Sequence, residues 1–103
     1  MKGSGDTWVV LMHVPADPSM GGSLFADPRF ADHVAFLNRM QTAGYLVAAG
    51  PLPDRPGEGM AVLRLPGPGR LAEATRLATE DDASVTGGLL AATVRPWQVL
   101  AEG

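Results

Sequence analysis

One segment near the N-terminus limits the folds open to this 103-residue chain more than any other. Residues 7–14, TWVVLMHV, are rich in β-branched and aromatic side chains, which predicts a β-strand that ends at Pro15. Alternate side chains of a strand point to opposite faces of the sheet, and here both sets are largely apolar. Because a sheet face in water carries polar residues, both faces of this strand are expected to be covered.

Proline and glycine divide the rest of the chain into further elements. Residues 15–28 have the composition of a long loop, after which Asp27 can cap a helix and Pro28 suits its first position. Gly44 is a suitable residue to end that helix after Ala43. The later predicted elements are strands at 45–50 and 60–65, a helix at 71–80, a turn region at 81–88 and a strand at 90–100, in which Pro96 indicates either an edge strand or a bulge.

The predicted order is β-α-β-β-α-β in a single domain, 1–103, whose residues 1–6 are expected to be flexible. This order indicates an α+β, ferredoxin-like fold: a four-stranded antiparallel sheet with two helices on one face. Two helices cover only one side of the sheet, so a second copy is expected to cover the other. Two sheets facing each other would form a homodimer of the dimeric α/β-barrel type.

Composition excludes several classes of function. The net charge is −3 without any basic cluster, which argues against binding to nucleic acid. Cysteine is absent, and the longest apolar run near the start is too short to cross a membrane, so a cytoplasmic protein is expected. The glycines do not form a phosphate-binding loop. The two histidines are far apart in the sequence, and no metal site or cofactor is predicted.

The predicted first helix carries one histidine beside its inward face. Helical spacing places His33 at the edge of an apolar stripe formed by Phe30, Val34, Leu37 and Met40. The strand at 45–50 runs back beside this helix, so Asp54 is expected near the helix start. A carboxylate on one imidazole nitrogen leaves the other free to move a proton, which makes His33 and Asp54 candidate catalytic residues. The alternative is a structural histidine beside an ordinary turn aspartate.

Other polar residues have simpler interpretations. His13 in the first strand can line a cleft or face a partner chain, but a buried, hydrogen-bonded core residue is the more common case. Asp81 and Asp82 are expected to form a surface turn after the second helix. Arg95 can neutralise an anionic substrate, although an inter-strand salt bridge is the commoner use.

The segment DHVAFLNRMQTAGYLVAAGPLPDRPGEGMAVLRL resembles the YciI-like (YCII-related) family. That family has a histidine early in its first helix, matched by His33, and a G-x-L-x-x-x-G-P-L-x-D segment. The residues that match this segment are Gly44, Leu46, Gly50, Pro51, Leu52 and Asp54. Asp82, Val85 and Gly88 match a later D-P-x-V-x-x-G-L motif, in which Ala83 replaces the proline.

The resemblance implies a dimeric α/β barrel with a histidine–aspartate acid–base pair in a cleft. It points to a small cofactor-independent enzyme of the isomerase, lyase or dehydrochlorinase type, acting on a small cyclic or aromatic acid or phenol. His13, Gly50, Pro51 and Leu52 are the expected substrate-binding residues. Two alternatives stay open: a non-catalytic ligand-binding or interaction dimer, and a cofactor-free oxygenase of the same architecture.

Overall fold

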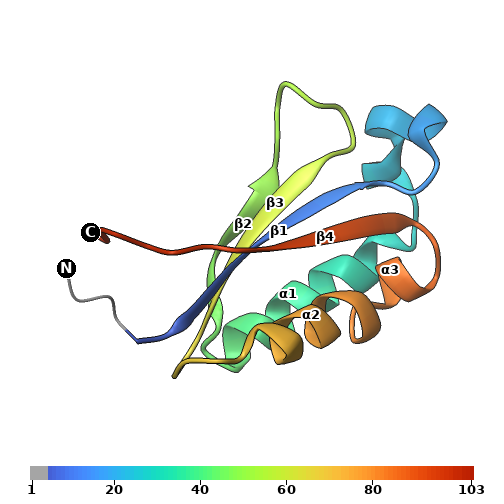
Figure 1. Ribbon diagram of the computed structural model, residues 1–103. Coiled ribbons are helices and arrows are strands. Elements are labelled where there is room, and N and C mark those ends of the chain that lie inside the picture. The colour runs from blue at the N-terminus through green and yellow to red at the C-terminus, as the bar shows by residue number, and fades with distance from the viewer. Residues whose placement is uncertain (1–4) are drawn as a thin grey trace.

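The computed structural model describes residues 5–103, so the predicted flexibility of residues 1–4 lies outside the described chain. The elements follow the predicted order, with two short helices added (Figure 1). They are β1 (Thr7–Pro15), the 3₁₀ helix η1 (Pro18–Ala26), α1 (Phe30–Thr42), β2 (Leu46–Pro51), β3 (Gly59–Leu65), α2 (Leu71–Glu80), α3 (Ala83–Thr86) and β4 (Leu90–Pro96).

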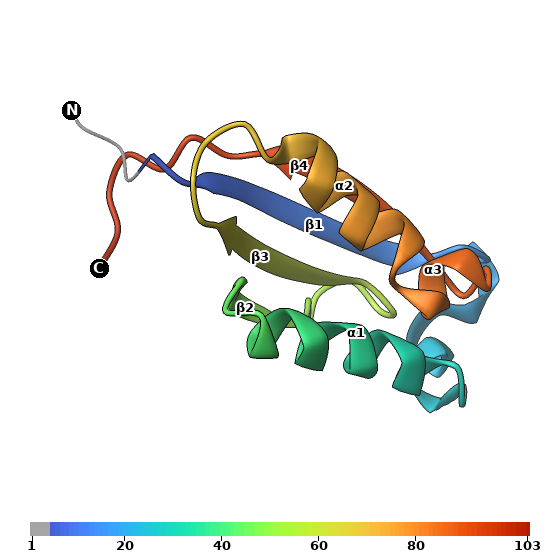
Figure 2. The same cartoon turned by 90° about the horizontal axis from the view of Figure 1, so that it is seen from below.

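The four strands form one sheet in the order β2-β3-β1-β4, and every neighbouring pair is antiparallel. Helices α1 and α2 lie side by side on the same face of this sheet, as the two views in Figures 1 and 2 show. The predicted α+β, ferredoxin-like fold is therefore confirmed. No helix within residues 5–103 is long and apolar enough to cross a membrane.

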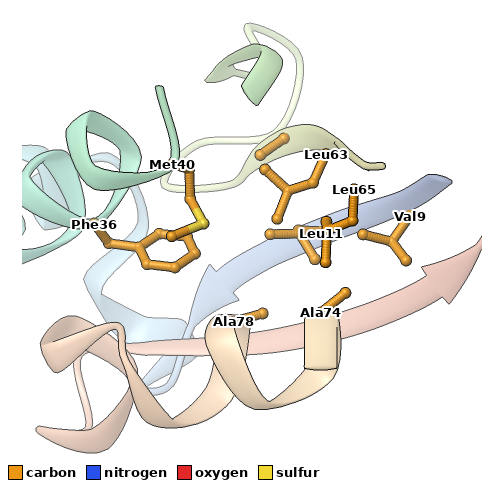
Figure 3. Close-up of a cluster of buried hydrophobic side chains, with 9 residues drawn as sticks. Val9, Leu11, Phe36, Met40, Leu63, Leu65, Ala74 and Ala78 are labelled. Carbon is orange, nitrogen blue, oxygen red and sulfur yellow. The ribbon is translucent and has the colours of Figure 1, made fainter. Parts of the chain in front are cut away.

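The main core lies between the helices and the sheet, and Figure 3 shows its side chains. Helix α1 contributes the buried residues Phe36 and Met40, while the buried residues of α2 are Ala74 and Ala78, beside which the partly buried Leu77 also packs against the core. The strand residues that complete this core are Val9, Leu11, Ala61, Leu63 and Leu65. Burial of these apolar side chains holds both helices on one face.

Helix α1 is rotated relative to the predicted inward stripe. Its buried residues are His33, Phe36 and Met40, whereas Val34 is 42% exposed. The prediction was wrong about Val34 because it assumed that every apolar residue of the helix packs into the core. Val34 lines a cavity, as do Phe30 and Leu37, although Leu37 also packs against the main core and Phe30 against a second buried cluster. The rotation moves His33 from the expected helix edge to the buried face.

The ends of several elements also differ from prediction. The carboxylate of Asp27 accepts a hydrogen bond from the Arg29 amide (2.9 Å), but it caps a turn and α1 begins only at Phe30. Strand β4 stops at Pro96, after which the Trp97 amide bonds the Trp8 carbonyl (3.0 Å). At the start of the described chain, the carboxylate of Asp6 accepts hydrogen bonds from Arg64 (2.6 Å) and from the Gly67 amide (3.0 Å), and the flexibility expected for residues 1–6 stays a prediction.

The sheet face away from the helices carries the other side chains of β1. Trp8, Val10 and Met12 are partly buried on this face and Val14 is exposed, whereas Val9 and Leu11 on the opposite face are fully buried. The predicted division of β1 into two apolar faces is thus confirmed. The described chain covers only the helix side completely.

Candidate functional site

The candidate site is a buried histidine–aspartate pair at the end of the sheet where β1 finishes and α1 begins. His33 lies in the first turns of α1, and Asp82 is the N-cap residue of α3. The His33 Nδ1 atom lies 2.7 Å from Oδ2 of Asp82. His33 is 7% exposed and Asp82 is completely buried, so this hydrogen bond is shielded from water.

Asp82 is held in position by its own helix cap. Its Oδ1 atom accepts hydrogen bonds from the amide of Ser84 (3.0 Å) and from the Ser84 hydroxyl (2.6 Å). Burial alone would raise the pKa of Asp82, but the hydrogen bonds from His33 and Ser84 outweigh it and hold the pKa below its ordinary value. Asp82 is therefore an ionised acceptor at neutral pH.

The charge of Asp82 determines the tautomer of His33. An ionised carboxylate can only accept, so Nδ1 of His33 must carry the proton that it donates. In the neutral imidazole the lone pair then belongs to Nε2. This arrangement provides a proton acceptor at Nε2 and a nearby negative charge that stabilises the imidazolium formed when Nε2 takes up a proton.

A second imidazole lies beside the pair. His13, in β1, is 2% exposed, and its ring centroid is 4.5 Å from that of His33. Burial, reinforced by the nearby His33, lowers the pKa of His13 to about 4 even though Asp82 acts in the opposite direction. His13 is thus neutral at physiological pH. Its Nε2 atom is buried without a hydrogen-bond partner, so the expectation of a buried residue is confirmed but that of a hydrogen-bonded one is wrong at this atom.

A cavity of about 260 Å³ opens against both imidazoles. The remaining wall is largely apolar, and among the described lining residues none is a lysine, arginine, aspartate or glutamate. Apart from His13 and His33, the lining residues are Leu24, Phe25, Phe30, Val34, Leu37, Gly50, Pro51, Gly57, Gly59, Met60 and Leu90. Such a pocket fits a small, mostly apolar ring that carries few polar groups.

One side of the cavity depends on a close approach between two loops. Gly57, in the connection between β2 and β3, has φ +82°, and a Cβ atom there would lie 2.3 Å from the carbonyl oxygen of Gly21 in η1. Glycine is therefore required for both conformation and space. This contact fixes the connection against η1, which supplies Leu24 and Phe25 to the cavity wall.

The structure brings together only part of the predicted site. His13, Gly50 and Pro51 line the cavity, whereas Leu52 does not. Asp54 is exposed, and within residues 5–103 no hydrogen bond or ion pair joins it to His33. The predicted pairing of His33 with Asp54 is replaced by the pairing with Asp82, because α3 delivers its capping carboxylate into the interior. Roles in catalysis and substrate binding stay predictions.

The expectation of a surface turn at residues 81–82 was half wrong. Asp81 is exposed, but Asp82 is buried and caps the four-residue helix α3. The Asp-x-Ser sequence was a usable signal for this cap, because a serine two residues after an aspartate can bond its carboxylate. Nothing in the local sequence linked this aspartate to His33, which is 49 residues away.

Three residues whose side chains can bind a metal ion also meet here, two histidines and one aspartate. One donor atom from each of His13, His33 and Asp82 lies within 4.8 Å of the donor atoms of the other two.

No protein-family model matches the chain, and no curated protein matches it either.

Proposed function

We propose that the protein is a small enzyme that moves a proton on a small cyclic or aromatic substrate, as an isomerase, lyase or dehydrochlorinase. The observation that carries this proposal is the buried His33–Asp82 hydrogen bond beside an apolar cavity. His33 acts as the general base and then as the general acid, through Nε2. Asp82 orients the ring and stabilises its protonated form.

The wall of the cavity narrows the substrate class. An anionic substrate would need a positive group to replace its hydration, yet the described lining offers only the neutral His13 and the catalytic imidazole. Arg95 is exposed and is not among the lining residues. Neutral phenols, cyclic ketones and lactones therefore suit this cavity better than carboxylic acids.

The fold and Asp82 also support descent from the YciI-like family, which we include in the proposal. Asp82 belongs to the segment that resembles a motif of that family, and it is the residue bonded to His33. The family histidine and this aspartate thus occupy one buried site. A pair of this kind is sufficient for proton transfer without a cofactor.

The test is exchange of substrate hydrogen for deuterium in heavy water, followed by nuclear magnetic resonance across a panel of neutral phenols, cyclic ketones and lactones. His33→Gln and Asp82→Asn are expected to slow exchange by about 10²–10⁴-fold, the usual contribution of a positioned acid–base group. The exposed neighbour Asp81→Asn is the matched control and should exchange like the parent. Full activity in His33→Gln would remove the proposal.

The variant Asp54→Asn tests whether Asp54 or Asp82 is the carboxylate that assists His33. Because Asp54 is exposed and the bond to His33 comes from Asp82, this variant is expected to keep nearly full exchange. A loss in Asp54→Asn equal to that in Asp82→Asn would restore Asp54 to the catalytic pair.

The second candidate function is a non-catalytic ligand-binding dimer, and the apolar side chains on the sheet face away from the helices favour it. Trp8, Val10, Met12 and Val14 lie on this face, where a second copy is proposed to pack. Mass analysis of a ligand recovered after incubation separates the two functions, since only an enzyme changes it. Sedimentation of the protein with and without Val10→Glu tests the dimer.

A further inference from the structure

We infer that His13, His33 and Asp82 form a binding site for a divalent transition-metal ion, with zinc as the principal occupant. The inference goes beyond the proposed proton-transfer activity and does not depend on turnover. It begins from the topology: β1, α1 and the cap of α3 each deliver one metal-binding side chain to the same buried place. All three are less than a tenth exposed.

The donor set matches the chemistry of zinc. Two imidazoles and a carboxylate, with a fourth position left for water or substrate, form one of the recurring catalytic zinc arrangements. At bond lengths of 2.0–2.2 Å the donors around a tetrahedral ion are about 3.4 Å apart. The three donor atoms here lie within 4.8 Å of one another, and the His33–Asp82 contact is 2.7 Å. Side-chain shifts of about an ångström would produce the geometry of a metal site.

The second observation is the unsatisfied nitrogen of His13. Its Nε2 atom is fully buried and has no hydrogen-bond partner, although a buried polar atom left alone destabilises the folded protein. The proton-transfer mechanism makes no use of this nitrogen. Coordination to an ion would satisfy it, which explains a polar side chain at a strand position otherwise suited to the core.

The surroundings also suit an ion. Ser84 holds the second oxygen of Asp82 through two hydrogen bonds, as outer residues commonly hold a ligating carboxylate. The cavity lies directly against both imidazoles and leaves space for a fourth ligand. One carboxylate against a doubly charged ion leaves a net positive charge, which would favour a bound hydroxide or phenolate.

Metal and proton compete for the same imidazole. A neutral histidine that ligates through one nitrogen keeps its proton on the other, so it has no lone pair with which to accept another proton. The zinc-loaded protein is therefore expected to lose proton transfer by His33, and a chelator should restore it. Binding and turnover can consequently be measured as separate properties of the same protein.

The test is a titration of chelator-treated, dialysed protein with Co²⁺, followed by visible absorption, and with Zn²⁺, followed by calorimetry. The result expected is one ion per chain. His13 and His33 are the only histidines of the chain, so no other imidazole can contribute. His13→Ala and Asp82→Asn should weaken binding at least about 100-fold, and Ser84→Ala about 10-fold, while Asp81→Asn binds like the parent.

Separate control experiments test whether the variants fold and whether the proposed function holds. His13→Gln keeps a polar side chain of similar size, and circular dichroism checks that it folds; zinc should raise the Tm of the parent but not of this variant. The inference is overturned by the absence of 1:1 binding, or by equal binding in the parent, His13→Gln and Asp82→Asn. Deuterium exchange by chelator-treated protein that binds no Co²⁺ would overturn the metal site and leave the proposed function standing. Binding of one Co²⁺ per chain by a protein that shows no deuterium exchange in its metal-free, chelator-treated form would overturn the proposed function and leave the metal site standing.

Discussion

Acidification should destabilise this protein through a single buried histidine. His13 has a folded-state pKa of about 4, whereas an unfolded histidine titrates near 6.5. The unfolded chain therefore binds a proton at this residue between pH 6.5 and 4 while the folded protein does not. The free energy of unfolding falls across this window as the pH falls, and it is independent of His13 above 6.5.

The size of the effect follows from the shift in pKa. One pKa unit corresponds to about 1.4 kcal/mol, so His13 is expected to account for a loss of about 3 kcal/mol between pH 7 and pH 4. Because His13 is only 2% exposed, solvent screening does not reduce this value appreciably. Asp82 has a lowered pKa, and its contribution to stability is lost only as the pH falls through that lower value.

The assay is urea unfolding at pH 7 and pH 4.5, followed by far-ultraviolet circular dichroism at one protein concentration. The variant His13→Leu cannot take up a proton at this position, so its free energy of unfolding should depend on pH less steeply than that of the parent by about 2–3 kcal/mol. Asp54→Asn, at an exposed position, serves as the control and should behave like the parent. The same pH dependence in His13→Leu and the parent would refute the reasoning.

Three further substitutions test the packing around the site. Phe36→Ala removes a fully buried ring from the core and is expected to cost about 3–5 kcal/mol in urea unfolding, whereas Phe25→Ala, at a side chain 41% exposed, should cost much less. Gly57→Ala places a Cβ against the Gly21 carbonyl at positive φ and should lower Tm by several degrees, unlike Ala substitution at the unobstructed Gly50. Ser84→Ala removes the hydroxyl bond to Asp82 and should cost about 1 kcal/mol, an expectation contradicted by unchanged urea unfolding.

Much of the fold could be predicted because its boundaries are marked locally. Pro15, Gly44 and the glycine-rich connections limit the strands and helices from within a few residues of each end, so their order could be read directly. The rotational phase of α1, which decides the residues that face the core, could not be predicted in this way. Val34 is apolar and lines a cavity while remaining 42% exposed, and periodicity does not distinguish a cavity wall from a core.

Of the two hydrogen-bonded residues of the site, only His33 could be predicted from the sequence. His33 stood out as one of two histidines, and its buried position follows from the actual phase of α1. Its partner depends on how α3 docks against α1, a contact between residues 49 positions apart. Asp82 looked like a surface turn residue because an aspartate beside another aspartate after a helix is usually solvated. Only the tertiary packing makes it a buried carboxylate.

The location of the site along the sheet has a practical consequence. Thr7 at the beginning of β1 and the segment after β4 lie at one end of the molecule, whereas η1 and α3 lie at the other (Figure 1). A dye, affinity handle or fused domain joined after Gly103 would therefore be attached far from His33. Immobilisation through that end should leave the cavity mouth accessible to small molecules in surface-based screening.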